Sequence, residues 1–125
     1  MTTTARSPLY GEVIRERWRR PRFRGELAGA AVVTAEDVNP LCGDRVRMQL
    51  RLEDGRVGAA RFTGDSCAIC TASADVVAEL VQGRGRDDAA GLQAGDVLRV
   101  LQADVRPTRM RCVTLPLTVL AKALA

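Results

Sequence analysis

The sequence predicts a single α+β domain, in which a small three-stranded antiparallel sheet packs against helices. Apolar and polar residues alternate between Arg45 and Leu52, a pattern typical of a half-buried strand. Asp54-Gly55 follows and accepts the positive φ angles of a tight turn, so that Arg56 to Phe62 completes a hairpin. Apolar residues at helical spacing lie on both sides of this hairpin. The 125 residues suit one domain and leave no room for a second.

Two further elements are predicted before the hairpin. Leu9 to Arg20 has apolar or aromatic residues at helical spacing, with glutamates placed to pair with arginines. We therefore expect an amphipathic helix that ends at Pro21. The short apolar run Ala30 to Thr34 is expected to add the third strand to the hairpin.

Turn and cap signals divide the chain after the hairpin. A helix is predicted from about Cys67 to Gln82, with Asp65 or Ser66 available to cap its first turn. The remaining elements are a polar connector with a short helical turn (Gly83–Gly95), a helical piece (Val97–Leu101), an extended stretch around Pro107 (Val105–Arg111) and a last helix (Leu115–Leu124). Pro116 is expected in the first turn of that helix, where a missing N–H costs nothing.

Composition excludes several classes of protein. No apolar run approaches the ~20 residues needed to cross a bilayer, and the first ten residues lack the features of a secretory signal, so we expect a cytoplasmic protein with reduced cysteines. Histidine is absent, which excludes the Ser/His/Asp and Cys/His arrangements. The Arg cluster between residues 15 and 24 is interleaved with glutamates and poor in aromatics, so a solvated, ion-paired face is favoured over nucleic-acid binding.

The four cysteines lie at three predicted element boundaries: Cys42 in the loop before the hairpin, Cys67 and Cys70 at a helix start, and Cys112 before the last helix. Loops and helix N-termini can converge on one point, where the helix dipole favours thiolates. Asp44 adds a carboxylate beside Cys42. A metal site and buried, inert cysteines are both compatible with this pattern. A thioredoxin-like dithiol at Cys67 and Cys70 is disfavoured, because that motif follows a strand of a βαβ unit.

Two longer motifs surround these residues. Asn39 to Asp44 reads NPLCGD, and Phe62 to Ala74 reads FTGDSCAICTASA. Both resemble motifs of the iron-sulfur cluster assembly family of IscU, NifU and SufU, and Arg111 to Leu115 (RCVTL) resembles the SufU segment around its third cysteine. IscU members have His at the position of Arg111, and Arg cannot ligate iron. The motifs are therefore closest to SufU, although this chain lacks the SufU insertion before the third cysteine and the chaperone-docking motif of IscU.

The resemblance implies a fold and a site. The fold would be SufE/NifU-like, with residues 1–125 as one NifU-like N-terminal domain. The implied ligands of a Zn²⁺ ion are Cys42, Asp44, Cys67 and Cys112. Arg109 and Arg111 would partly offset the negative charge of that site.

The resemblance also implies a function. Cys42 would accept persulfide sulfur from a cysteine desulfurase, and the sulfur would pass to a downstream iron-sulfur assembly complex, a sulfurtransferase role. Neither nucleic acid nor a membrane is expected as a partner. Cys70 lies one helical turn from Cys67 and is a candidate additional ligand.

Two other functions stay open. An IscU-like scaffold would hold a transient [2Fe-2S] cluster on Cys42, Cys67 and Cys112, with Cys70 available as a fourth thiolate. A structural zinc module would instead use its Arg-rich helix to bind a partner.

Overall fold

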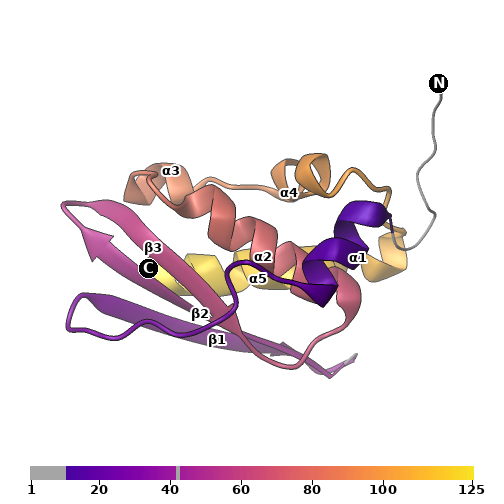
Figure 1. Cartoon of the computed structure of the whole chain (residues 1–125), viewed down its shortest axis with the longest axis horizontal. Coiled ribbons are helices and arrows are strands. Elements are labelled where there is room, and N and C mark those ends of the chain that lie inside the picture. Colours follow the sequence, from indigo (N-terminus) through magenta and orange to yellow (C-terminus); the bar gives the residue numbers. More distant parts are fainter. Residues whose placement is uncertain (1–10, 42) are drawn as a thin grey trace.

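A three-stranded antiparallel sheet in the order β1-β2-β3 forms one layer of the molecule (Figure 1). The computed structural model describes residues 11–41 and 43–125. The strands are β1 (Val32–Asn39), β2 (Asp44–Glu53) and β3 (Arg56–Thr63). The predicted α+β class is confirmed.

The hairpin between β2 and β3 has the turn that the sequence predicts. Asp54 and Gly55 have φ angles of 53° and 75°, as a tight hairpin turn of this type requires. Val46, Met48 and Leu50 of β2 are buried, and the residues between them are partly exposed. The alternation along β2 therefore reflects one core-facing side and one outer side of the sheet.

Two long helices, α2 (Ala68–Val81) and α5 (Met110–Leu124), cover the core-facing side of the sheet. α5 packs on β1 and β2, and α2 packs on β3. α1 (Glu12–Arg19) and α4 (Ala94–Leu101) pack on α2. The short helices α3 (Arg86–Ala90) and η1 (Pro107–Arg109) complete the chain. α2 is thus enclosed between other elements, which explains why almost all its residues are buried (Figure 1).

Strand β1 is longer than the predicted strand over 30–34. It continues to Asn39, which pairs with Asp44 at the start of β2. Glu36 and Asp37 interrupt the apolar pattern, so the sequence signal stops before the strand does. Pairing with β2 holds these polar residues in the sheet.

The last helix begins five residues earlier than predicted, and the predicted extended stretch 105–111 is wrong. Residues 107–109 form η1 and α5 starts at Met110, which leaves Pro116 inside the helix. Proline in a helix interior removes the hydrogen bond to the carbonyl four residues earlier, here that of Cys112. Burial of Cys112 and Val113 favours the early start, so tertiary packing overrides the local preference of proline.

The N-cap of α2 also differs from the prediction. The cap is Cys67, whose Sγ accepts a hydrogen bond from the backbone N–H of Cys70 at 3.4 Å. Ser66 instead shares a hydrogen bond with the hydroxyl of Thr71. Gly83 follows the helix with φ 86° and ends it as predicted.

The predicted N-terminal helix is confirmed from Glu12, while Leu9 and Tyr10 lie outside the described residues.

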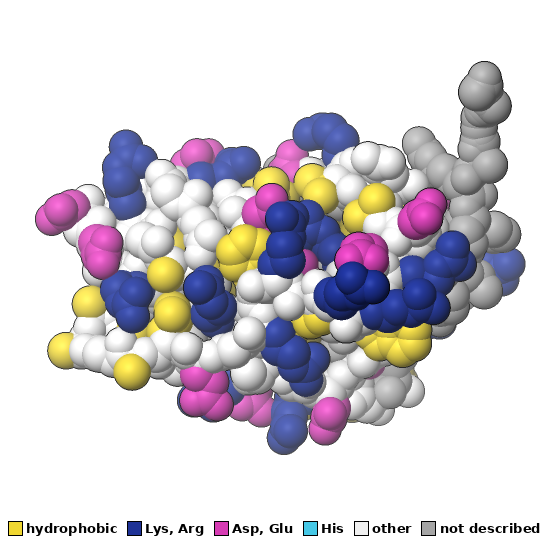
Figure 2. Space-filling view, viewed as in Figure 1, with side chains coloured by type: hydrophobic (Ala, Val, Ile, Leu, Met, Phe, Trp, Pro, Cys, Tyr) yellow, Lys and Arg dark blue, Asp and Glu magenta, His cyan; other side chains and the backbone are white. Residues whose placement is uncertain are grey.

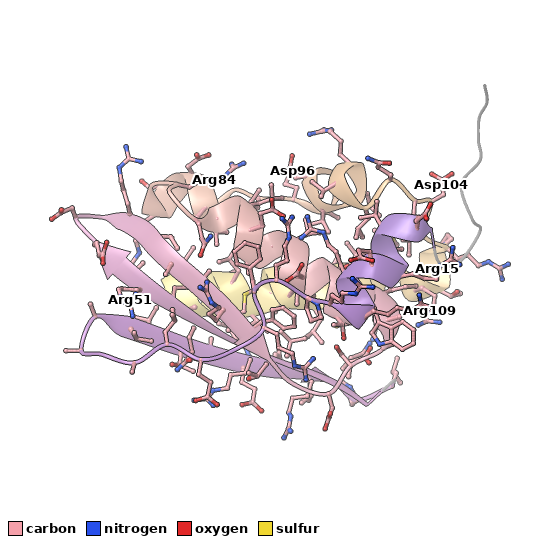
Figure 3. The ribbon with its side chains drawn as sticks, in the orientation of Figure 1. Arg15, Arg51, Arg84, Asp96, Asp104 and Arg109 are labelled. Carbon is pink, nitrogen blue, oxygen red and sulfur yellow. The ribbon has the colours of Figure 1, made fainter. Side chains whose placement is uncertain are left out.

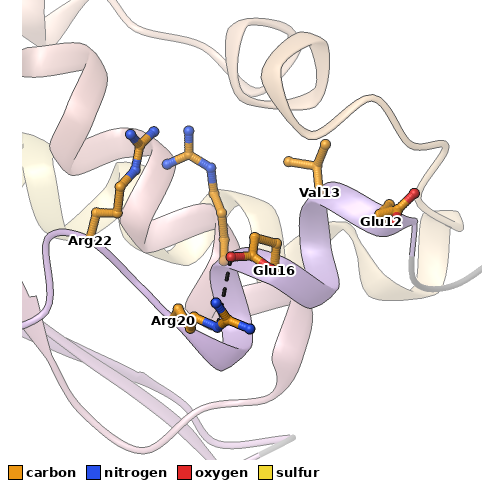
Figure 4. Close-up of a pocket in the computed structure, with 6 residues that line it drawn as sticks. Glu12, Val13, Glu16, Arg20 and Arg22 are labelled. Carbon is orange, nitrogen blue, oxygen red and sulfur yellow. Dashed lines mark ion pairs between the residues drawn. The ribbon is translucent and has the colours of Figure 1, made fainter.

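Arginines and acidic side chains are interspersed on the surface (Figure 2). Arg22 pairs with Glu79, and Arg84 pairs with Asp88, each at 3.4 Å. A hollow of about 450 Å³ beside α1 is lined mainly by such charged residues (Figure 4). None of the helices in the described residues combines the length and apolar character needed to cross a membrane.

A buried ion pair joins α1 to α2. The carboxylate of Asp75 is fully buried and accepts hydrogen bonds from Arg17 Nη1 and from the backbone N–H of Phe23, both at 2.8 Å. Arg17 is itself only 11% exposed. A buried carboxylate is tolerated only when such partners replace water, so this contact fixes α1 and the segment after it on α2.

We expect Arg17→Ala to lower the free energy of unfolding by about 3 kcal/mol, because the substitution leaves the Asp75 charge buried without its cation. Arg20→Ala is the matched control, since Arg20 is exposed and its ion pair with Glu16 is long, at 4.0 Å (Figure 4). Its effect should stay within about 0.5 kcal/mol. Denaturant unfolding of both variants measures the difference, and equal effects would contradict a structural role for the buried pair.

Candidate metal centre

Three chain segments meet at one end of the sheet and bring together Asp44, Cys67 and Cys112. Asp44 begins β2, Cys67 caps α2, and Cys112 lies in the first turn of α5. One potential ligand atom from each residue lies within 4.8 Å of the other two. Cys42, the fourth predicted ligand, lies outside the described residues, two positions before Asp44.

Asp44 makes two contacts through its two carboxylate oxygens. Oδ1 accepts a hydrogen bond from the backbone N–H of Cys67 at 2.9 Å, and Oδ2 lies 3.7 Å from Cys112 Sγ. The residue is only 4% exposed. One carboxylate therefore connects the start of the second strand to the first turns of both long helices.

Hydrogen bonds of Asn39, Leu41 and Gly43 shape the connection between β1 and β2. Gly43 N–H donates to the carbonyl of Asn39 at 2.8 Å, and the side chain of Asn39 accepts from Leu41 N–H at 3.2 Å. Gly43 has φ 76°, a conformation that favours glycine. These contacts direct the chain from β1 back into β2 at the site.

Gly64 permits the close approach of the segment that leads to Cys67. It has φ 136°, and a Cβ at this position would lie 2.1 Å from the carbonyl oxygen of Arg45. The neighbouring Asp65 carbonyl accepts a hydrogen bond from Arg45 N–H at 2.8 Å. The segment between β3 and α2 is thereby held against the start of β2, next to Asp44.

The sulfurs of Cys67 and Cys112 lie 3.4 Å apart. Burial raises the pKa of the Cys112 thiol above its ordinary value, the hydrogen bond from Arg109 acts in the opposite direction, and the neighbouring Cys67 adds to the rise. Two adjacent sulfurs in a buried site favour a bound cation, because a cation stabilises both as thiolates.

Arg109 is the cation of this site. The neighbouring sulfurs of Cys112 and Cys67 raise the pKa of its guanidinium above the ordinary value. Figure 3 shows it at the end of the molecule where α5 begins. Arg111 is exposed and lines a shallow groove between β1 and α5 instead. Of the two arginines predicted to offset the site's charge, Arg109 is the one whose pKa the two sulfurs raise.

Cys70 is buried next to the candidate site but is not one of its potential ligands. Its side chain is fully buried, and desolvation raises the pKa of its thiol above the ordinary value, with the charge of Asp44 acting in the same direction. Its sulfur does not belong to the group formed by Asp44, Cys67 and Cys112 among the described residues. Its backbone N–H nevertheless holds the Cys67 sulfur, so Cys70 contributes to the site through the main chain.

The donor set fits Zn²⁺. A tetrahedral zinc with Zn–S bonds of about 2.3 Å places two sulfur ligands about 3.7 Å apart, and a sulfur and an oxygen slightly closer. The observed separations, 3.4 Å between the sulfurs and 3.7 Å from sulfur to carboxylate, lie within a few tenths of an ångström of that geometry. Three anionic ligands around a dication leave one negative charge, which Arg109 would neutralise.

Two features of the site could not be predicted from the sequence. The second role of Asp44, as hydrogen-bond acceptor for the start of α2, depends on a contact between residues 23 positions apart. The requirement for Gly64 depends on the close approach of Arg45, and the sequence shows only a glycine after a strand. Both are tertiary contacts without a local pattern.

The chain is similar to known proteins over almost its whole length. The family model for the NifU-like N terminal domain matches residues 9–125. The zinc-dependent sulfurtransferase SufU of Bacillus subtilis is 29% identical, over 94% of this chain and 90% of its own length. The iron-sulfur cluster assembly scaffold protein IscU of Thermotoga maritima is 31% identical, over 93% of this chain and 92% of its own length.

Solved structures show the same fold. SufU from Fervidobacterium islandicum superposes with a TM-score of 0.79 at 24% identity, covering 93% of this chain and 96% of that one. The N-terminal part of a NifU-like protein from Brucella abortus gives a TM-score of 0.72 at 22% identity, covering 93% and 92% of the two chains. The fold and the site thus define a protein of the iron-sulfur cluster assembly class. The chain belongs to the NifU-like N-terminal domain family.

We expect Gly64→Ala to lower the free energy of unfolding by about 2–4 kcal/mol, because the substitution strains the backbone and collides with Arg45. Gly95→Ala is the matched control, since Gly95 lies in α4 with open space around it and should gain about 0.5–1 kcal/mol. Thermal melting of both variants tests this expectation. A Gly64→Ala variant that melts like the parent would contradict the close approach.

We expect Cys70 to resist alkylation in the folded protein, because its thiol is buried and its raised pKa disfavours the reactive thiolate. Peptide mapping after iodoacetamide treatment should find Cys70 unmodified in native protein and modified after denaturation. Similar labelling rates in both states would show that Cys70 is accessible.

Proposed function

We propose that this chain is a SufU-like, zinc-containing sulfur acceptor that receives persulfide sulfur from a cysteine desulfurase for iron-sulfur cluster assembly. The single observation that carries the proposal is the cluster of Asp44, Cys67 and Cys112 at zinc-ligand spacing. The resemblance to a zinc-dependent sulfurtransferase over 94% of the chain supports it. The family match over residues 9–125 supports treating the chain as one domain.

Zinc suits a transfer protein of this kind. The ion has no redox chemistry and holds thiolates in a defined geometry, and a carboxylate is its most exchangeable ligand here. Arg111, at the position where IscU members have His, cannot bind a metal. This departure favours the zinc-containing branch of the family.

Cys42 is the proposed sulfur acceptor, and as the third thiolate it completes the set of four ligands. Its thiolate attacks the outer sulfur of the desulfurase persulfide, which forms a new S–S bond and breaks the old one. The desulfurase leaves as a thiolate, so no external oxidant or reductant is needed. The sulfur then passes to a downstream assembly complex in the cytoplasm.

An IscU-like scaffold is the second candidate. The 31% identity to an IscU scaffold protein favours it, as does the short segment between Cys67 and Cys112, which lacks the SufU insertion. In that case a [2Fe-2S] cluster would be the cargo assembled on Cys42, Cys67 and Cys112. Anaerobic isolation separates the two candidates, because a scaffold yields reddish protein and a transfer protein yields colourless zinc protein.

We expect one zinc per chain, with Cys67→Ser and Cys112→Ser each lowering both the zinc content and the melting temperature. Loss of a structural metal removes much of the folding free energy of a small domain. Cys70→Ser is the matched control and should keep its zinc, because Cys70 is outside the ligand group. Metal analysis and thermal melting test this, and full zinc in both ligand variants would disprove the assignment.

We expect sulfur to be trapped on Cys42 after anaerobic incubation with a cysteine desulfurase and cysteine. Intact mass should rise by one sulfur, and peptide mass spectrometry should locate it on the peptide from the NPLCGD loop. Persulfide found only on Cys112 would transfer the acceptor role to that residue. The absence of any persulfide would favour the scaffold.

A further inference from the structure

Helix α1 presents two exposed arginines beside an exposed tryptophan. Arg15, Trp18 and Arg19 are spaced three and four residues apart, so they are neighbours on the helix surface. Trp18 is the single tryptophan of the chain and is 49% exposed. These three residues are called the α1 face below. Tryptophan and arginine often dominate the free energy of protein–protein binding, so this composition is typical of an interface.

The arginines of the α1 face are not neutralised by acidic neighbours. Arg17, Arg20 and Arg22 each pair with an aspartate or a glutamate. Neither Arg15 nor Arg19 forms an ion pair with any residue in the part of the chain that the structure describes. The ion-paired surface predicted for the Arg cluster therefore does not extend to these two side chains.

The segment around α1 carries the positive charge of the protein. Residues 11–24 contain six arginines and two glutamates, a net charge of +4, which equals the net charge of the whole chain. The charges of all other residues therefore sum to zero. Figure 2 shows arginine side chains gathered over α1. A surface of this charge attracts an acidic partner and disfavours a basic one.

The α1 face and the candidate metal centre are close enough to share one interface. Arg17 lies on the same helix and contacts Asp75 of α2. Asp75 follows Cys67 by eight residues, which corresponds to about 12 Å along a helix. Figure 3 shows Arg15 and Arg109 at the same end of the molecule. A typical partner covers about 800 Å² of a protein surface, a patch roughly 30 Å across. A protein that docks on the α1 face can therefore reach the metal centre.

We propose that the α1 face docks the cysteine desulfurase, with an acidic patch of that enzyme against Arg15 and Arg19 and an apolar recess around Trp18. The inference rests on the proposed sulfur-acceptor function, which requires the desulfurase to approach this end of the molecule. Opposite charges steer the two proteins together, and burial of the indole stabilises the complex once it has formed. The α1 face takes no part in the sulfur-transfer step itself.

Two variants of the full-length, zinc-loaded protein remove the two kinds of contact. Arg15→Glu/Arg19→Glu reverses the charge of the face, and Trp18→Ala removes the indole. Arg56→Glu/Arg99→Glu is the matched control, because it reverses the charge of two exposed arginines outside the face. Zinc content and melting temperature show whether each variant is folded. Arg15 and Arg19 are exposed, so their variant should fold, and it decides the outcome if Trp18→Ala does not.

The first measurement is the affinity for the cysteine desulfurase of the same organism, by calorimetric titration at low and at high salt. We expect the control to bind within about twofold of the parent. Both α1-face variants should bind at least about tenfold more weakly at low salt, which corresponds to about 1.4 kcal/mol. The loss caused by charge reversal should shrink at high salt, because salt screens exposed charges, while the loss caused by Trp18→Ala should persist. Equal affinities at low salt would overturn the inference, as would no binding to the parent.

The second measurement separates docking from sulfur transfer. Persulfide formation is followed by intact mass at increasing concentrations of desulfurase. We expect both variants to need more desulfurase for the half-maximal rate and to keep the maximal rate of the parent, as loss of binding alone requires. A lower maximal rate at an unchanged half-maximal concentration would show that the face acts in the transfer step, against the inference. If the parent binds the desulfurase but forms no persulfide, the proposed acceptor function fails, and the titrations still decide the role of the α1 face.

Two other occupants of the face are tested with the same variants. Binding to labelled single-stranded RNA is measured by fluorescence anisotropy, and self-association by sedimentation. If charge reversal abolishes RNA binding or dissociates a dimer while the affinity for the desulfurase stays that of the parent, the face binds RNA or a second copy and the inference is wrong. If charge reversal weakens desulfurase binding alone, the assignment is supported.

Discussion

The carboxylate of Asp44 is the contact on which the site end of the molecule depends. It is almost fully buried, and its two oxygens face the N–H of Cys67 and the thiol of Cys112. A buried carboxylate that loses such partners costs several kcal/mol. The start of β2 and the first turns of α2 and α5 are therefore held together by one group. The same carboxylate is a candidate metal ligand, so the fold and the candidate metal centre share a single constraint.

The enclosed position of α2 makes this end of the molecule rigid. The helix lies between the sheet and the outer helices, and the buried pair of Asp75 with Arg17 fixes α1 on it. Cys67 caps this helix, with its sulfur held by the N–H of Cys70. A sulfur held on the most buried element of the fold is suited to a permanent ligand.

The candidate metal centre has a cation beside it. The sulfurs of Cys112 and Cys67 raise the pKa of the Arg109 guanidinium, so this side chain would partly offset the charge of anionic ligands. Its Nε is buried and has no hydrogen-bond partner among the described residues. The IscU and SufU relatives are similar over almost the whole chain. The distinction between transfer protein and scaffold therefore depends on what these few polar groups bind and not on the fold.

Local patterns in the sequence were enough to specify the hairpin, and the motifs around the cysteines pointed to three residues, Asp44, Cys67 and Cys112, that the structure brings together. The alternation along β2, the Asp54-Gly55 turn and the motif around Asp44 all act over a few residues. Long-range packing settled the start of α5, because burial of Cys112 and Val113 outweighs the preference of Pro116 for a first turn. That start also decides which side chains face the sulfurs, since the direction of a helical side chain depends on where its helix begins.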